Sequence, residues 1–406
     1  MTIDLQPRTE AGARLIEAAE ALQGDLRRNA AAADRSSGLN PDNFSMLQQT
    51  GIAGAFVPEA LGGWGLTSVH DWMLGVRALG QGDGSTAIAI SMHFGVSRGM
   101  AQAFAQAGAN TDSPAAAPLR AIADGKMLIC ATATERGTDN LHPFTEATRD
   151  GDEWVINGAK MFVTMSPVAT HLAMNLRMRD ESGDHLATTM MPIDTPGLVP
   201  QDDWDALGMR GSGSQSVVFD NVRLHKRAVR TIGPWGQWST QVLINRTLGN
   251  LALVGAFLGI AEHARELALT ALESQKRVGE LMNTNPGVQQ AVGELEIELL
   301  RCRAVLAHTG LGVDNWLADA ARHPPILGDA HELMQTYQAA KWTVNRGAIA
   351  IVDQALDLAG GAGFMSGHPL SRLYRDVRAG PFMQPHAAVD IRRYVGQVAL
   401  GLYPDA

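Results

Sequence analysis

The spacing of hydrophobic and polar positions changes twice along the chain. From Ala11 to about Gly108 the pattern is mostly helical, and residues 14–32 are rich in the good helix formers Ala, Leu, Glu and Arg. From about Met127 to Arg230 the period shortens towards two, as in strands. Helical spacing returns from about Trp238 to the end. The pattern predicts helices, then strands, then helices.

Capping and breaking residues place several helix boundaries. Asn40 is a good cap before Pro41, so a helix is expected to begin there. Three glycines make Leu61–Thr67 a loop, after which Thr67 or Ser68 could cap the next helix. Residues 329–358 are expected to form a helix that ends at Gly360-Gly361.

A second long helix is predicted before Pro324-Pro325. Its apolar positions fall on one helical face and are Val288, Ala291, Val292, Leu295, Leu299, Cys302 and Leu306.

The strand-rich region contains three hairpin candidates. The first turns at Asn157-Gly158, a strong hairpin signal. The second joins His171–Met178 to His185–Ile193 through a polar segment, and the third turns at Asp220-Asn221. We therefore expect a small antiparallel β domain of roughly a hundred residues.

Charge and composition exclude several classes of function. The chain has 406 residues, a net charge of −9 and a pI near 5.7, which disfavours nucleic acid as a partner. Cys130 and Cys302 stand far apart in apolar stretches and read as reduced core thiols. Neither a signal core nor a membrane span is evident, so a cytoplasmic location is the default.

Familiar catalytic motifs are absent from the sequence. No GxGxxG fingerprint follows a strand, and there is no Walker A loop. No HExxH or similar spacing suggests a metal site, and no GxSxG elbow suggests a serine hydrolase. We therefore expect no catalytic metal.

Five segments in order resemble motifs of the acyl-CoA dehydrogenase family. They are Val57–Leu66, Ala133–Asp139 (two residues shorter than the family signature), Asn157–Thr164, Leu207–Ser212, and Gly360–Phe364 followed by Leu373–Asp376. The resemblance covers about residues 40 to 401. It implies an α+β fold with an N-terminal helical domain (1–124), a central antiparallel β domain (125–235) and a C-terminal four-helix bundle (236–406).

The resemblance also implies an FAD site. An isoalloxazine ring needs a flat apolar wall and polar groups at its edge. By analogy with the family, Thr134 would hydrogen-bond the flavin edge, Phe162 would pack on the ring, and Thr164 would touch it. Backbone groups of Ala131 and Ala133 would line the edge, with Thr138 near the pyrophosphate. Taken singly, Phe162 and Thr134 would be read as ordinary sheet residues.

A second part of the FAD site is expected to come from another subunit. Glycines at Gly360 and Gly361 allow a backbone to approach a diphosphate closely, although a plain helix cap would also need glycine there. The family's FAD-binding arginine maps onto Gln275, and the neighbouring Arg277 is the expected substitute. Because a second subunit would complete the FAD site, we expect a homo-oligomer, either a homodimer or a homotetramer.

The family's catalytic carboxylate is missing. Ten residues into the C-terminal segment, the position holds Gln384, and an amide cannot take the α proton of a thioester. The alternative position for the glutamate, on an earlier helix, holds Gly249, followed by Asn250. The family arginine is absent there too, and Arg246, one turn earlier, is its expected partial substitute.

Three explanations of this departure remain open. His386 or His93 could be a substitute base, although each reads equally well as a satisfied polar residue. Flavin monooxygenases of this fold lack the glutamate, because oxygen activated on the flavin needs hydrogen-bond donors, and Gln384 and His386 suit that role. The third explanation is a thioester-binding protein with weak catalysis. Asp390 is read as a solvated residue.

The favoured function is therefore FAD-dependent oxidation of an acyl thioester, on CoA or a carrier protein. A flavin monooxygenase is the alternative. Electron-transfer flavoprotein would be the partner of a dehydrogenase, and a flavin reductase that of a monooxygenase.

Overall fold

The first part of the chain is helical, as predicted. The computed structural model describes residues 5–277 and 279–404, without the Arg277 side chain. Asn40 caps its helix by accepting from Asp42 N, and Ser68, of the two candidates, caps the next by accepting from Asp71 N. The elements are α1 (Glu10–Ser36), α2 (Pro41–Gln49), η1 (Ile52–Gly54), η2 (Glu59–Leu61), α3 (Val69–Gly82), α4 (Gly84–Gln106) and α5 (Ala116–Ala123).

The central part forms one mixed sheet. Its order is β6-β7-β3-β2-β4-β5-β8, with β1 paired to β4. Most pairs are antiparallel, but β1 and β2 both run parallel to β4. The strands are β1 (Ile129–Thr132), β2 (Glu146–Asp150), β3 (Glu153–Val163), β4 (His171–Asp180), β5 (Gly183–Pro192), β6 (Leu198–Pro200), β7 (Gln215–His225) and β8 (Val229–Pro234). A short helix, η3 (Arg210–Ser212), precedes β7.

Two of the three predicted hairpins are wrong. The β4–β5 hairpin is confirmed, but Asn157-Gly158 and Asp220-Asn221 lie inside the continuous strands β3 and β7. The two signals face each other across one irregularity, between the pairs Ile156↔Val222 and Gly158↔Phe219. There Asn221 has φ +52° and donates its backbone N–H to Asn157 Oδ1 at 2.9 Å. The turn-forming residues therefore make a β-bulge instead of two turns.

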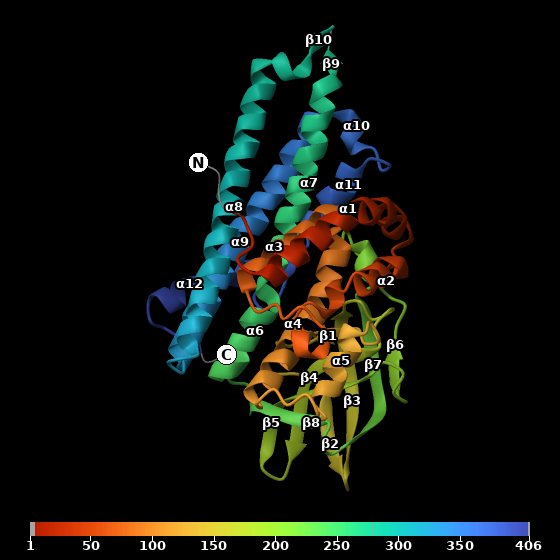
Figure 1. Cartoon of the computed structure of the whole chain (residues 1–406), viewed down its shortest axis with the longest axis vertical. Helices are drawn as coiled ribbons and strands as arrows, with labels where there is room; N and C mark the ends of the chain where they lie inside the picture. Colours follow the sequence, from red (N-terminus) through yellow and green to blue (C-terminus); the bar gives the residue numbers. More distant parts are fainter. Residues whose placement is uncertain (1–4, 278, 405–406) are drawn as a thin grey trace.

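The last part of the chain is a bundle of long helices (Figure 1). The predicted apolar face of α8 is confirmed, because Leu295, Leu299, Cys302 and Leu306 are buried. Helix α9 ends at Ala359, and its C-cap is Gly360, which has φ +64°. The elements are α6 (Thr240–Leu251), α7 (Leu253–Ser274), β9 (Lys276–Arg277), β10 (Glu280–Leu281), η4 (Met282–Thr284), α8 (Pro286–Ala320), α9 (Leu327–Ala359), α10 (Gly361–Phe364), α11 (Pro369–Val377), η5 (Gly380–Phe382) and α12 (Ala388–Ala399).

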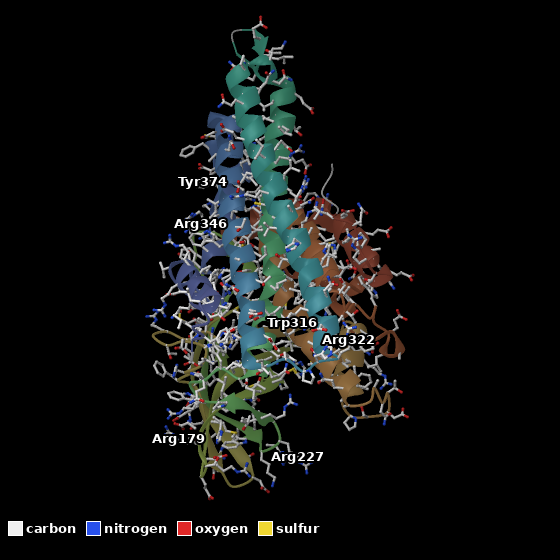
Figure 2. All side chains as sticks on the ribbon, turned by 90° about the vertical axis from the view of Figure 1, so that its left-hand side faces the viewer. Arg179, Arg227, Trp316, Arg322, Arg346 and Tyr374 are labelled. Carbon is white, nitrogen blue, oxygen red and sulfur yellow. The ribbon has the colours of Figure 1, made fainter. Side chains whose placement is uncertain are left out.

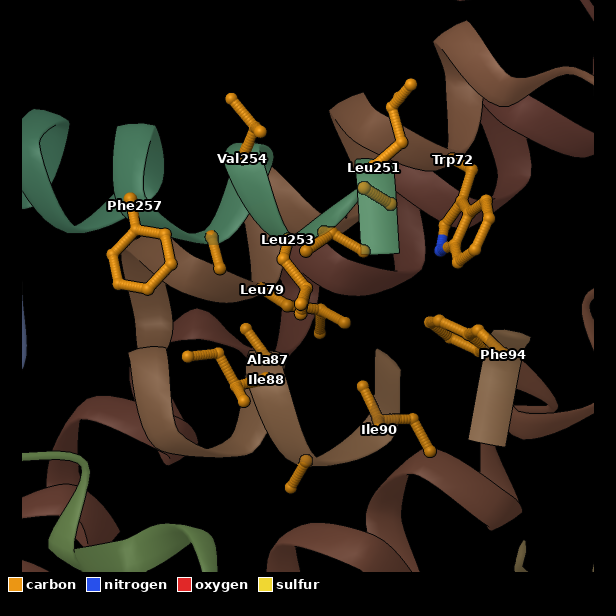
Figure 3. Packing of buried hydrophobic residues seen from close by; sticks show 14 of the residues in the cluster. Trp72, Leu79, Ala87, Ile88, Ile90, Phe94, Leu251, Leu253, Val254 and Phe257 are labelled. Carbon is orange, nitrogen blue, oxygen red and sulfur yellow. The ribbon is translucent and has the colours of Figure 1, made fainter. Parts of the chain in front are cut away.

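The two helical parts share one hydrophobic core. Trp72 and Leu79 of α3 and Phe94 of α4 pack towards Leu253 and Phe257 of α7 (Figure 3). The helices approach closely at Gly255, where a Cβ would lie 2.3 Å from Met73 O. The helical stretch 240–274 is long and apolar enough to cross a membrane, but 78% of its apolar window is buried inside the protein. We therefore assign it to the core.

Candidate active site at Gln384

The side chain of Gln384 joins the C-terminal segment to the β domain. Its Nε2 donates to Thr134 Oγ1 at 3.1 Å, and its Oε1 accepts a hydrogen bond from Asn140 Nδ2. Both polar ends of the amide are thus engaged, which fixes its orientation. Gln384 and Thr134, each proposed from sequence for this site, are brought together; Asn140 was not foreseen.

Helix α9 holds the backbone on which Gln384 sits. Tyr337 OH donates to Gln384 O at 2.9 Å. One turn later, Lys341 Nζ donates to His386 O at 2.6 Å and also to Met383 O. Lys341 is only 1% exposed, and burial lowers the pKa of its amine to about 7. The loop is therefore fastened on both sides of Gln384 by donors from one helix face.

His386 is a poor base in this setting. Its ring packs against Tyr394 with centroids 4.4 Å apart, and its buried Nε2 has no hydrogen-bond partner among the described residues. Burial, with a contribution from the charge of Lys341, lowers the pKa of His386 to about 4. Asp390 lies exposed in the first turn of α12, as expected of a solvated residue.

His93 does not suit the catalytic role that the sequence suggested. It is fully buried, its Nδ1 accepts from Ile129 N at 3.1 Å, and its Nε2 lies 2.9 Å from Ala53 O. The second contact requires Nε2 to carry the proton, so both nitrogens serve the backbone. Burial lowers the pKa of His93 to about 4. His93 is a satisfied core histidine that ties α4 to β1.

The predicted flavin wall lies beside this cluster. Ala131 belongs to β1, Ala133 and Thr134 follow it, and Met161 N donates to Thr134 O at 2.9 Å. Phe162 has φ +51° and leaves 49% of its surface exposed at the end of β3, with Trp204 edge-on at 6.0 Å between ring centroids. An apolar ring left open beside polar groups is what an isoalloxazine needs, so these residues fit a flavin.

Two predicted cofactor threonines already have partners within the protein. Thr164 is buried, and its hydroxyl pairs with Ser214 Oγ at 2.8 Å. Thr138 Oγ1 donates to His142 O at 2.6 Å inside the loop after β1. Each hydroxyl can still accept a further hydrogen bond from a ligand.

A buried ion pair that the sequence analysis did not single out stiffens the same loop. Lys160 Nζ lies 2.5 Å from Glu135 Oε1, and both side chains are buried. Glu135 also accepts from Phe144 N at 2.6 Å and from Thr145 N. Because Glu135 follows Thr134 directly, this pair anchors the residue that meets Gln384.

Within one subunit, Gly360 and Gly361 lie far in space from the Gln384 cluster. The α9–α10 junction stands near the top of Figure 1, whereas β3 lies near the bottom. A Cβ at Gly361 would have nothing within 4 Å, and one at Gly360 would meet only Gln275 Nε2, at 3.9 Å. The backbone of Arg277 lies at the same end, in β9, but its side chain is outside the described residues. Both groups of predicted FAD residues can serve one cofactor only if a second subunit supplies this end.

Family models match most of the chain in three pieces. The N-terminal domain of acyl-CoA dehydrogenase matches residues 13–110, the middle domain 129–222, and the C-terminal domain 247–384. The chain belongs to the acyl-CoA dehydrogenase family. It is an acyl-CoA dehydrogenase-like flavoenzyme, and the fold inferred from its motifs is confirmed.

Several similar proteins within this family are nitrososynthases. The chain is 37% identical over 404 residues to the amino sugar nitrososynthase DnmZ of Streptomyces peucetius, covering 98% of this chain and 95% of that protein. It is 35% identical over 403 residues to the L-evernosamine nitrososynthase of a Micromonospora species, covering 98% and 93%.

A solved structure of KijD3 has the same fold. That structure contains FMN and dTDP-3-amino-2,3,6-trideoxy-4-keto-3-methyl-D-glucose. It superposes with a TM-score of 0.90 at 32% identity, covering 100% of this chain and 98% of KijD3.

Both positions expected for the family carboxylate lack an acid. Gln384 occupies the first, bonded as described above. At the second, a Cβ on Gly249 would have nothing within 4 Å, and Asn250 Nδ2 donates to Arg246 O at 2.8 Å. Among the described residues, no group of three potential metal ligands is found either. The two positions at which we expected the family's proton acceptor therefore hold an amide and a glycine.

Proposed function

We propose that this protein is a flavin-dependent N-oxygenase that oxidises the amino group of a nucleotide-linked amino sugar. The observation that carries the proposal is the Gln384 amide, fixed between Thr134 and Asn140 at the position where we expected the family's carboxylate. The nitrososynthase relatives, similar over nearly the whole chain, supply the substrate class.

The site is badly suited to removing the α proton of a thioester. An amide is no base, and the two histidines first considered as substitutes have a pKa near 4. Loss of a general base costs typically 10²–10⁴-fold in rate. Oxidation of an acyl thioester on CoA or a carrier protein, and thioester binding without catalysis, are thus the weaker alternatives, supported only by membership of the family.

Oxygen transfer needs hydrogen bonds more than a carboxylate. A reduced flavin bound against Phe162 and Thr134 would supply two electrons to O₂, so that one oxygen atom reaches the amine nitrogen and the other leaves as water. A primary amine becomes a hydroxylamine in one such round and a nitroso compound, with loss of a second water, in the next. Gln384, Asn140 and Thr134 would orient the reacting groups, and Lys341 and Tyr337 would keep Gln384 in place.

The electron donor follows from this chemistry. Each round consumes one O₂ and two electrons. The proposed partner is therefore a flavin reductase that takes these electrons from a reduced nicotinamide, in place of an electron-transfer flavoprotein. We propose that FAD is the cofactor, as the glycines at Gly360 and Gly361 of a second subunit would admit its adenylate half. FMN, present in the KijD3 structure, is the alternative. A soluble, cytoplasmic homo-oligomer, a dimer or a tetramer, completes the proposal.

The test is a turnover assay with labelled oxygen. The protein, a flavin, a flavin reductase and a reduced nicotinamide are incubated under ¹⁸O₂ with a dTDP-linked 3-amino sugar. The expected product has gained one labelled oxygen atom and lost two hydrogens, and it is absent without the protein. An unchanged amino sugar, with flavin turnover producing only hydrogen peroxide, would refute the proposal.

A further inference from the structure

Arg246 on α6 is a half-buried arginine that forms no ion pair with the described residues. Its Nη2 is buried with no hydrogen-bond partner among the described residues. Arg372 and Arg303, by contrast, form ion pairs: Arg372 lies 3.3 Å from Asp83, and Arg303 lies 2.8 Å from Glu262. An unpaired buried charge is costly, so proteins retain one chiefly where a ligand neutralises it.

The face of α6 places Arg246 beside the Gln384 cluster. Val242, one turn before it, packs in a hydrophobic cluster with Leu141, whose neighbour Asn140 binds Gln384. Residues four apart on a helix share a face, so Arg246 projects towards the same region. The charge of Arg246 also reaches Lys160: burial chiefly, and then Arg246, lower the pKa of Lys160 against the opposing effect of Glu135.

Open space continues along the same face. Gly249 follows one turn after Arg246, and a Cβ there would meet nothing within 4 Å. On its other side Gly249 packs closely against α4, because a Cβ at Gly95 would lie 3.4 Å from Gly249 O. The Arg246 side chain is half-buried, so a ligand can reach it from solvent.

We propose that Arg246 anchors a phosphate oxyanion of the substrate's nucleoside diphosphate. The inference rests on the proposed function for its choice of substrate. A guanidinium offers paired donors that match a phosphate, and burial, without an opposing contribution from an acidic group, lowers the pKa of Arg246 to about 10. The flavin's own phosphate has the same chemistry, and the experiment separates the two sources.

Equilibrium binding to Arg246→Met and Arg246→Lys tests the anchor. Pyrophosphate and dTDP should each bind the Met variant about 10–100-fold more weakly than the wild type, since a charge-assisted hydrogen bond contributes about 1.5–3 kcal/mol. Thymidine, which has no phosphate, should bind the wild type and Arg246→Met with equal affinity. The Arg246→Lys variant should recover part of the lost affinity, because lysine keeps the positive charge but lacks the paired N–H donors of a guanidinium. The matched control is Arg322→Gln, on the exposed arginine after α8 (Figure 2), which should change nothing.

The same titrations with FMN and riboflavin identify the source of the phosphate. Arg246→Met should leave the affinity ratio of FMN to riboflavin unchanged. A ratio that falls 10-fold or more, with dTDP binding intact, would assign the phosphate to the flavin and overturn the proposal. Equal binding of pyrophosphate to wild type and variant would remove the anchor altogether. Wild type that binds pyrophosphate but not dTDP would keep the anchor and refute the proposed nucleotide substrate.

Thermal unfolding of the ligand-free protein gives an independent readout. Removing an uncompensated buried charge should raise the melting temperature of Arg246→Met above that of the wild type. A lower melting temperature would mean that Arg246 supports the fold, which contradicts a role reserved for a ligand.

Discussion

Gln384 Nε2 lies 3.1 Å from Thr134 Oγ1, although the two residues are 250 positions apart in the sequence. The bond connects the loop before α12 to the end of β1, and Asn140 holds the other end of the same amide. A carboxylate at this position could not donate to Thr134, so the amide and the hydroxyl form a matched pair.

Gln384→Ala should lower kcat for amine oxygenation by about 10–100-fold, because two hydrogen bonds of about 0.5–1.5 kcal/mol each are lost. Thr134→Val removes only one of them and should cost less. Since both variants remove the same bond, the double variant should lose less than the product of the two single losses. Steady-state kinetics of all three variants checks this. Fully multiplicative losses would show that the bond does not matter in turnover.

Lys341→Met should also slow turnover without weakening flavin binding. The change leaves Met383 O and His386 O without their donor, so the loop that carries Gln384 loosens. We expect a loss of about 30-fold in kcat, on the basis of roughly 1 kcal/mol for each of the two lost hydrogen bonds. Tyr337→Phe removes only the bond to Gln384 O and should have a smaller effect. A lower melting temperature with unchanged kcat would instead indicate a purely structural lysine.

The free energy of unfolding should depend on pH because of Lys341. Burial lowers its pKa from 10.5 to about 7 in the folded state, near His386. Between these values the unfolded chain binds the proton and the folded chain does not, so this group adds stability as pH rises from about 7. The difference in unfolding free energy, wild type minus Lys341→Met, should therefore increase between pH 7 and pH 10. A difference independent of pH would show that Lys341 has an ordinary pKa.

Sequence alone predicted the features that depend on local chemistry. Caps at Asn40 and Ser68 and the stop at Gly360 follow from side-chain and backbone preferences of single residues. Asn157-Gly158 misled for the same reason, because its turn preference is equally satisfied by a bulge opposite Asn221. Which outcome occurs depends on the neighbouring strand, and that strand lies 64 residues away.

The candidate site was predicted only where a motif carried it. Thr134 and Phe162 stand at motif positions and Gln384 was reached by counting from the last motif, whereas Asn140 lies in a loop with no distinguishing signal. Lys341 did carry a signal: it shares a helix face with buried Tyr337 and Val344, where a charged residue requires an explanation. The pair of Glu135 and Lys160 likewise involves two motif positions whose contact only the fold reveals.

Gly361→Val should distinguish the two flavins. The position opens onto space within the chain, so the substitution should leave the fold intact. If this end contacts the adenylate half of FAD in another subunit, the variant should bind FAD more weakly and FMN as well as the wild type does. Calorimetric titration with both flavins checks this, with light scattering to establish that the oligomer persists. Equal affinity for FAD in both proteins would place the adenylate elsewhere.

The central claim is that Gln384 marks an oxygenating site, and anaerobic mixing with saturated acyl-CoAs tests it most directly. The flavin-loaded wild type is mixed with a panel of chain lengths in a stopped-flow instrument while flavin absorbance is followed. The account predicts that the oxidised flavin persists with every thioester, and that Gln384→Glu, which restores a carboxylate, increases the rate of bleaching. Rapid bleaching by the wild type, slowed in Gln384→Glu, would contradict it and identify a dehydrogenase whose base lies elsewhere.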